Sequence, residues 1–267
     1  MTAQNPIERA QAAARERLGS MSPRERGVEK TKAALTWLYR WGWSSPTLID
    51  RIGGNKSGGL CARLLKAGLV QRERTAAGGV ALDVPVWIIT LTPLGLQEIE
   101  RFERQLVMYE PEIVRVRQEQ IRHDYLVQLE TIKRLDRGEI HGFNTPLQLR
   151  ARSEDGVKQP DAIWLTPENC RVAVEMELTA KWGRHFDQFI VRLLRGVRLN
   201  QEANNLFDSV LILSDSPALL ERYEAALQPG NTVQIWTQTK DRKWVEQRMS
   251  KVPIYNTDLI EFELLKP

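Results

Sequence analysis

The chain has 267 residues, of which 42% are hydrophobic and 27% charged, and its formal net charge is +4. This is the composition of an ordinary globular protein, and the length allows two modest domains, each with its own core. No apolar stretch is long enough to cross a membrane, and residues 1–28 lack the apolar run of an export signal. The two cysteines, Cys61 and Cys170, suggest neither a zinc site nor a disulfide framework. We therefore expect a cytoplasmic protein without membrane partners.

Positive charge is concentrated in the N-terminal part of the chain. Residues 1–110 contain 16 lysines and arginines against 11 aspartates and glutamates, whereas the remainder contains 22 against 23. Residues 1–28 carry several arginines among alanines and glutamates, which predicts a basic helical or mobile arm. A local excess of cations is what binding to nucleic acid requires. On charge alone, DNA binding and simple solvation of the surface both remain open.

Residues 29–108 show the pattern of a small helical domain with a hairpin. Apolar residues at helical spacing are followed by glycines that stop a helix, at Gly42, at Gly53-Gly54 and at Gly68. Ser45-Pro46 and Thr92-Pro93 are typical of helix starts. The predicted elements are helices at 32–41, 46–52 and 60–67, strands at 70–74 and 85–91 around a flexible tip at 75–79, and a further helix from 93.

Three helices followed by a hairpin is the order of a winged helix. The strings KAGLV at residues 66–70 and LTPLG at residues 91–95 resemble the helix-to-wing and wing-to-helix junctions of that family. The resemblance covers residues 29–108, and it implies that the third helix enters the major groove while the wing lies on the backbone. The residues that it implies as DNA contacts are Lys56, Ser57, Arg63, Lys66, Arg72 and Arg74. The alternative is a dimerisation or docking module.

The chain beyond residue 110 alternates helices and strands. A long helix is expected from Pro111 to Asp136, with Ile121, Tyr125, Leu129 and Ile132 on one face and Glu119, His123, Leu126 and Glu130 on the other. We interpret His123 as an ordinary hydrogen-bonded histidine. Strands are then predicted at 147–152, 159–165 and 171–178, followed by a helix at 181–200, a strand at 209–213, a helix at 217–227 and a strand at 232–237. Most of the tryptophans, Trp236 among them, are expected in the core.

Acidic residues interrupt the apolar strand at 171–178. Because side chains alternate along a strand, Glu175 and Glu177 share the face opposite Val174 and Met176. Two carboxylates on one face repel each other unless a cation neutralises them. Asp161, in the preceding strand, would supply a third oxygen ligand. Such acids suit Mg²⁺ or Mn²⁺, and the pattern predicts a metal-dependent nuclease site.

The order helix, three strands, helix, strand, with Pro160-Asp161 on the second strand and Glu175-x-Glu177 on the third, resembles the PD-(D/E)XK nuclease superfamily over residues 111–240. With the winged helix, it resembles the replication-relaxation and mobilisation proteins of plasmids and integrative elements. The resemblance implies an α/β fold in which residues 109–267 form a restriction-endonuclease-like α/β sandwich with a mixed sheet. It implies Asp161 and Glu175 as metal ligands, Glu177 in the place of the usual catalytic lysine, and Glu130 as a further helix acid.

Without a lysine at position 177, a catalytic cation has to come from elsewhere. We expect Lys181 to reach back over the strand end, and we interpret Lys158 as a solvated surface lysine. Along the helix that follows, Arg184, Gln188 and Arg192 share a face suited to DNA.

The sequence therefore predicts a DNA-binding, nuclease-like protein of a mobile element that nicks or cleaves double-stranded DNA with Mg²⁺ or Mn²⁺. Two alternatives stay open: a catalytically degenerate accessory factor in plasmid transfer or replication, and a protein-docking adaptor. Other transfer or replication proteins and a second copy of the chain are further candidate partners.

Overall fold

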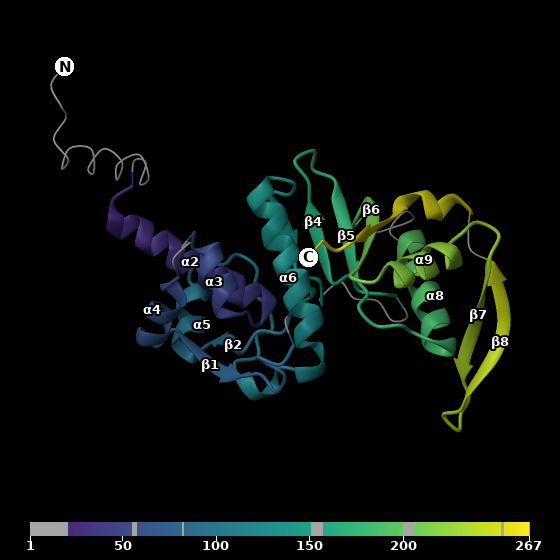
Figure 1. Cartoon of the computed structure of the whole chain (residues 1–267), viewed down its shortest axis with the longest axis horizontal. Coiled ribbons are helices and arrows are strands. Elements are labelled where there is room, and N and C mark those ends of the chain that lie inside the picture. The colour runs from purple at the N-terminus through teal and green to yellow at the C-terminus, as the bar shows by residue number, and fades with distance from the viewer. Residues whose placement is uncertain are drawn as a thin grey trace, which may run out of the picture. The chain divides into compact units, whose positions relative to one another are not determined.

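The computed structural model describes residues 21–54, 58–81, 83–150, 157–199, 206–251 and 254–266 (Figure 1). The chain is a mixed α/β protein that divides into two compact units. The first comprises residues 1–78 and 86–116, and the second comprises residues 79–85 and 117–267. No helix among the described residues is long and apolar enough to span a membrane.

In its described residues, the N-terminal unit contains four α-helices and a two-stranded antiparallel sheet. Its first helix starts at a capping box made by Ser22 and Glu25 and ends at Gly42, whose φ of 85° suits glycine. The next helix starts where the Ser45 hydroxyl accepts from the amide of Leu48. The elements are α2 (Pro23–Trp41), α3 (Pro46–Ile52), α4 (Leu60–Lys66), β1 (Val70–Arg74), β2 (Trp87–Leu91), α5 (Pro93–Glu100) and the 3₁₀ turn η1 (Ile113–Arg115).

Tight packing joins the hairpin of this unit to its helices. Val70 pairs with Leu91 where β1 and β2 meet, and both side chains are buried. Gly95 in α5 lies so close to the main chain that a Cβ there would be 1.9 Å from the carbonyl oxygen of Leu69. A glycine is therefore required at this crossing. Trp43 is buried as well, with 5% of its surface exposed.

The C-terminal unit is organised around a mixed five-stranded sheet. Its strand order is β3-β4-β5-β6-β9, in which β3, β4 and β5 are antiparallel, β6 runs parallel to β5, and β9 runs parallel to β6. A separate antiparallel hairpin, β7–β8, follows α9. The elements are the 3₁₀ turn η2 (Gln118–Gln120), α6 (Ile121–Arg137), β3 (Gly142–Asn144), α7 (Pro146–Leu149), β4 (Ala162–Leu165), β5 (Arg171–Met176), α8 (Gly183–Leu199), β6 (Ser209–Ser214), α9 (Pro217–Ala226), β7 (Thr232–Gln238), β8 (Trp244–Lys251), the 3₁₀ turn η5 (Ile254–Leu259) and β9 (Ile260–Leu264).

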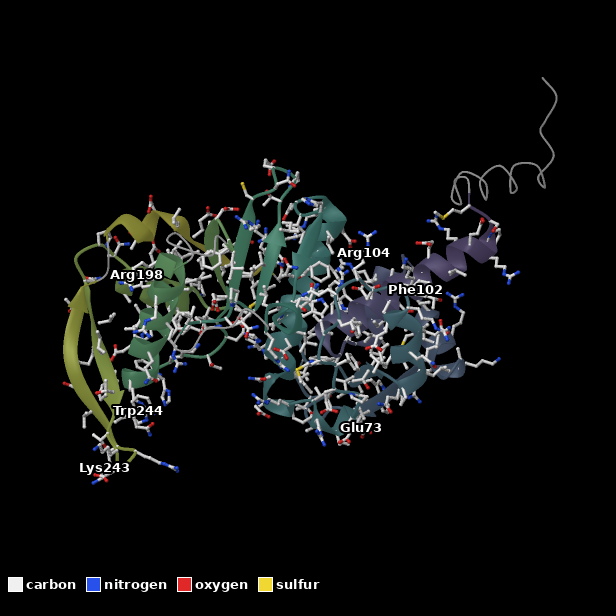
Figure 2. The ribbon with its side chains drawn as sticks, turned by 180° about the vertical axis from the view of Figure 1, so that it is seen from behind. Glu73, Phe102, Arg104, Arg198, Lys243 and Trp244 are labelled. Atoms are coloured by element: carbon white, nitrogen blue, oxygen red, sulfur yellow. The ribbon has the colours of Figure 1, made fainter. Side chains whose placement is uncertain are left out.

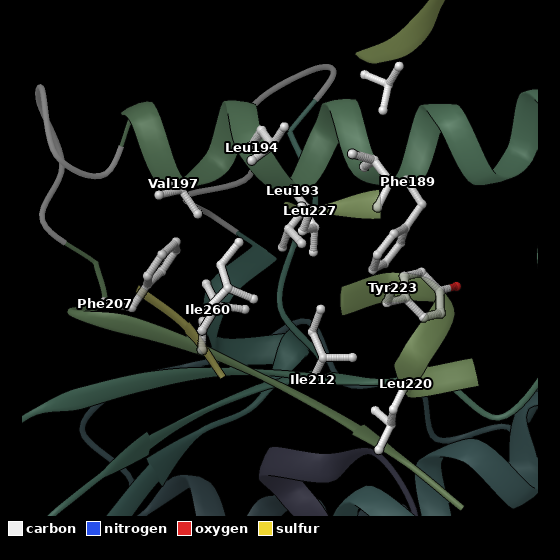
Figure 3. Close-up of a cluster of buried hydrophobic side chains, with 14 residues drawn as sticks. Phe189, Leu193, Leu194, Val197, Phe207, Ile212, Leu220, Tyr223, Leu227 and Ile260 are labelled. Atoms are coloured by element: carbon white, nitrogen blue, oxygen red, sulfur yellow. The ribbon is translucent and has the colours of Figure 1, made fainter. Parts of the chain in front are cut away.

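A hydrophobic cluster holds α8 and α9 against one face of this sheet (Figure 3). Leu193 of α8, Tyr223 of α9 and Ile212 of β6 are all nearly inaccessible to solvent. Ala173 of β5 belongs to the same cluster. Because side chains alternate along β5, Glu175 is directed to the same side of the sheet as Ala173. The sheet thereby places an acidic side chain under α8 and α9.

The prediction of a strand at 147–152 is wrong for residues 147–150, the part of this range that the structure describes. Residues 146–149 form the short helix α7, and the first strand of the meander is β3, at 142–144. The reason is local: Thr145 and Gln148 form a capping box, and Pro146 stands in the first turn. Residues 151–156, which include the rest of that strand and the predicted turn, lie outside the described residues.

The long helix predicted from Pro111 starts only at Ile121, after the two 3₁₀ turns. Its buried side also differs from the predicted apolar face, because Tyr125 and Leu129 are only half-buried whereas polar residues are buried. One of them, Thr131, accepts a hydrogen bond from the indole nitrogen of Trp164 at 2.9 Å. A buried hydroxyl thus acts as the partner of a buried tryptophan on β4.

Candidate functional site

The β4–β5 hairpin sets Asp161 and Glu175 opposite each other. Ala162 pairs with Val174, and the amide of Asp161 donates to the carbonyl oxygen of Val174 at 2.9 Å, which extends the pairing by one residue. Directly opposed residues of an antiparallel pair point to the same face. The carboxylate of Asp161 also accepts from the amide of Met176 at 2.8 Å. Two acids from different strands are therefore brought to one end of the hairpin.

Lys158 lies between these two acids. Its Nζ is 2.5 Å from Oε2 of Glu175 and 3.4 Å from Oδ1 of Asp161. The interpretation of Lys158 as a solvated surface lysine is therefore wrong, because its ammonium is the shared ion-pair partner. Burial acts to raise the pKa of Asp161, but the charges of Lys158 and His123 outweigh it and hold that pKa below its usual range.

The carboxylate of Glu175 is almost completely buried, with 2% of its side chain exposed. Burial raises its pKa to about 8 against the opposing effect of Lys158, and the negative charge of Asp161 adds to the rise. Its Oε2 atom makes no hydrogen bond of good geometry although the lysine ammonium is close. This oxygen is thus buried with the ammonium of Lys158 as its cationic neighbour.

His123 of α6 contacts Asp161, one member of this pair. The sequence alone did not indicate this contact. Its Nε2 is 3.1 Å from Oδ2 of Asp161, and its Nδ1 is 2.9 Å from Oδ1 of Asp124. Burial lowers the pKa of His123, but the two neighbouring carboxylates outweigh burial and raise it to about 10. The imidazolium therefore donates to Asp161 at neutral pH. His123 is hydrogen-bonded, as expected, but its partner is a candidate catalytic acid.

Glu177 has a different set of partners. Its carboxylate forms an ion pair with Lys181 and accepts a hydrogen bond from the hydroxyl of Tyr223 at 2.9 Å. Tyr223 is fully buried; burial, followed by the charge of Glu177, raises its pKa. The ammonium of Lys181 also lies over the ring of Phe189, 4.8 Å from its centroid. Lys181 is thus held at Glu177, and no described contact joins it to Asp161 or Glu175.

Glu130 lies away from the opposed acids. Its carboxylate is bound by Lys133 at 2.9 Å, one turn further along α6. It follows His123 by two helical turns, which correspond to roughly 10 Å along the axis. The structure therefore gives Glu130 a local ion pair, and its described partners do not include the acids of the hairpin.

The donor chemistry of Asp161 and Glu175 fits a hard divalent cation. Mg²⁺ is commonly held by one or two carboxylates, with water and phosphate oxygens completing its shell. The prediction that three carboxylates meet at one ion is wrong for the described residues. No three His, Cys, Asp or Glu side chains among them are close enough to bind one ion together. The candidate ligand atoms are the carboxylate oxygens that face Lys158, which are Oδ1 of Asp161 and Oε2 of Glu175. An ion binding at the pair has to displace the ammonium of Lys158.

The residues expected to contact DNA lie on two surfaces. In the N-terminal unit, Arg63, Lys66, Arg72 and Arg74 are exposed, and the guanidinium of Arg72 covers the ring of Trp87 at 4.8 Å. Lys56 and Ser57 lie outside the described residues.

In the C-terminal unit, α8 carries Arg184, Gln188 and Arg192. Arg192 is exposed, and Arg184 and Gln188 are half-buried. The guanidinium of Arg184 lies over the ring of Trp244 at 4.5 Å. These contacts combine cations with aromatic rings on each of the two surfaces.

Comparisons with protein families, curated proteins and solved structures find no match to this chain.

Proposed function

We propose that the chain is a DNA-binding, nuclease-like protein of the mobilisation or replication-relaxation type, which nicks or cleaves DNA with a divalent cation. The observation that carries the proposal is the placement of Asp161 opposite Glu175 at the end of the β4–β5 hairpin. An opposed acid pair beside a basic helix is an arrangement suited to binding a metal ion and a phosphodiester together.

The topology around the pair supports the PD-(D/E)XK resemblance. The chain runs α6, β3, β4, β5, α8, β6, with three antiparallel strands and a fourth parallel to the third. This is the order expected for a restriction-endonuclease-like α/β sandwich with a mixed sheet. The order α2, α3, α4, β1, β2 in the N-terminal unit likewise supports a winged helix. Fold alone does not dictate activity, so the acids carry the argument.

Each residue of the site has a separate proposed role. Asp161 and Glu175 would hold Mg²⁺ or Mn²⁺, which when bound supplies water activation and neutralisation of phosphate charge. His123 orients the carboxylate of Asp161 through its 3.1 Å contact. Tyr223 and Lys181 fix the carboxylate of Glu177 beside the pair, at the position where it could orient a water molecule.

A second candidate function is DNA binding without cleavage. It is favoured by Lys158, whose ammonium already compensates the acid pair, and by Glu177 in the place of the usual lysine. In this version the chain is an accessory factor whose acids and lysines form a stable ion-pair network. Both candidates require DNA affinity, and they differ in metal-dependent cutting.

Supercoiled plasmid separates the candidates. The wild-type chain and the variants Asp161→Ala and Glu175→Ala are incubated with plasmid and Mg²⁺ or Mn²⁺, with Glu261→Ala, an exposed acid on β9, as the control. Metal-dependent nicking that both site variants lose and the control keeps supports cleavage. Intact plasmid with a gel shift that weakens as salt rises supports the accessory factor. If no salt-sensitive affinity is found, both DNA-based functions fail and a protein-docking adaptor remains.

A further inference from the structure

Helix α8 and the β7–β8 hairpin enclose an open groove of about 170 Å³, which we call the hairpin groove. One wall belongs to the helix and the other to the hairpin. Its polar and aromatic lining residues are Gln188, Arg192, Arg195, Gln234, Trp236 and Trp244. Trp236, expected in the core, is only half-buried and lines this groove.

The surroundings of the hairpin groove are strongly basic. Residues 183–199 contain four arginines and one aspartate, and the turn at 239–243 contains three cations and one aspartate. Arg192 and Arg195 are both exposed on the helix wall. The aspartate of α8, Asp187, accepts a hydrogen bond from the indole nitrogen of Trp236 at 2.9 Å. The groove therefore has the charge of a surface that receives a polyanion.

The hairpin wall offers aromatic rings in fixed positions. Trp244 is 39% exposed, and Arg184 of α8 lies over its ring. Figure 2 shows Trp244 next to Lys243 at the turn end of the hairpin. Indole rings and guanidinium planes are the surfaces on which unpaired bases stack, whereas the bases of a duplex are already stacked on each other. Rings that line a basic groove thus favour a single strand over a duplex.

One turn of α8 links the hairpin groove to the segment that carries Lys158. The amide of Lys158 donates to the carbonyl oxygen of Arg192 at 3.4 Å, so the segment that carries the site lysine packs on the turn of α8 that lines the groove. Gly196 permits this approach, because a Cβ there would be 3.3 Å from Val157. The main chain of α8 at Arg192 therefore contacts the segment that carries Lys158, the ion-pair partner of Asp161 and Glu175.

We propose that the hairpin groove binds an unpaired nucleic-acid strand, with a base stacked at Trp244 and phosphates at Arg192 and Arg195. This inference rests on the proposed DNA binding and names the form of DNA that reaches the acid pair. In the proposed function the contacts of the N-terminal unit are to duplex DNA, whereas the hairpin groove binds an unpaired strand.

Fluorescence anisotropy with a labelled 20-nucleotide single strand and the duplex of the same sequence tests the proposal. Trp244→Ala is compared with Trp182→Ala, an exposed tryptophan outside the groove, and Arg192→Ala with Arg198→Ala on the same helix. We expect Trp244→Ala to weaken single-strand affinity about tenfold, as loss of one stacked base does. The duplex affinity of Trp244→Ala should change less than about twofold, because duplex binding depends on phosphate contacts, which a tryptophan ring does not make. Both control variants, whose residues lie outside the groove lining, should keep their single-strand affinity within about twofold of the wild-type value.

The outcomes separate this inference from the proposed function. If the wild-type chain binds DNA but Trp244→Ala and Arg192→Ala bind the single strand as the controls do, the groove assignment is overturned while DNA binding stands. If the wild-type chain binds neither form, both are overturned. Circular dichroism and thermal unfolding of each variant check that a loss of affinity does not reflect a loss of folding.

Discussion

Replacement of Lys158 by methionine removes the cation between Asp161 and Glu175 and keeps most of the volume of the side chain. Asp161 then keeps only His123 as a cationic partner, and the carboxylate of Glu175 loses Lys158; the side chains of the two acids are 17% and 2% exposed. Removal of one partner from a buried ion pair costs about 3–5 kcal/mol. Because a quarter of the lysine side chain is exposed, we expect a value near the lower end, about 3 kcal/mol of unfolding free energy.

A divalent cation should restore this loss. An ion that binds the folded state at 100 times its dissociation constant adds about 2.7 kcal/mol, which nearly offsets the cost of the substitution. Lys158→Met should therefore gain more stability from Mn²⁺ than the wild-type chain, in which the ammonium competes with the ion. Urea unfolding in EDTA and in Mn²⁺ measures both quantities without any DNA.

Lys181→Met is the matched control, because it removes a lysine from Glu177 and leaves the hydroxyl of Tyr223 in place. We expect Lys181→Met to be less stable than the wild-type chain in EDTA, and Mn²⁺ to stabilise it no more than it stabilises the wild-type chain. If Lys158→Met is as stable as the wild-type chain in EDTA, or if Mn²⁺ stabilises all three chains equally, the assignment of the acid pair as an ion site is refuted.

Two further predictions test the fold. Gly95→Ala should destabilise the N-terminal unit by about 1–3 kcal/mol or more, as overpacking does, because its Cβ would collide with the carbonyl of Leu69; Gly27→Ala, which meets nothing within 4 Å, should be neutral or stabilising in the same thermal unfolding experiment. A thiol reagent at pH 8 should label exposed Cys170 at once and Cys61 only after unfolding, since burial raises the pKa of Cys61 to about 11. If mass spectrometry detects rapid labelling of both thiols in the folded protein, the buried placement of Cys61 is contradicted.

Local signals located several element boundaries correctly, and the errors have local causes. Gly42 ends α2 where the sequence predicts it, yet the helix begins nine residues before the predicted start. Residues 23–31 are polar and contain a glycine, so hydrophobic spacing does not reveal them. The capping box of Ser22 and Glu25 sets the start instead. The same motif at Thr145 explains α7. Capping chemistry was thus a better guide to helix starts than apolar periodicity.

The site depended on contacts that no local pattern contains. Alternation along β5 correctly predicted that Glu175 lies on the face opposite Val174, but it could not identify the cation beside Glu175. His123 reaches Asp161 across 38 residues of sequence, and its residue type alone indicated no more than an ordinary hydrogen-bonded histidine. Lys158 was easier to propose as the cation partner of Asp161, since it precedes Asp161 by only three residues. The strand register shows that the two acids are opposed, and the ion-pair distances show that the ammonium of Lys158 lies between them.

The charges around Asp161 and Glu175 favour the hypothesis that a divalent cation displaces Lys158 from this pair. Asp161 is compensated twice, by Lys158 and by His123, and its pKa is lowered despite burial. Glu175 shares only Lys158, and its pKa is raised to about 8 by burial and by the neighbouring acids. One ammonium thus serves two buried carboxylates, whereas a doubly charged ion would neutralise both at once. The more buried acid, Glu175, therefore has one described cationic partner, whereas the less buried Asp161 has two.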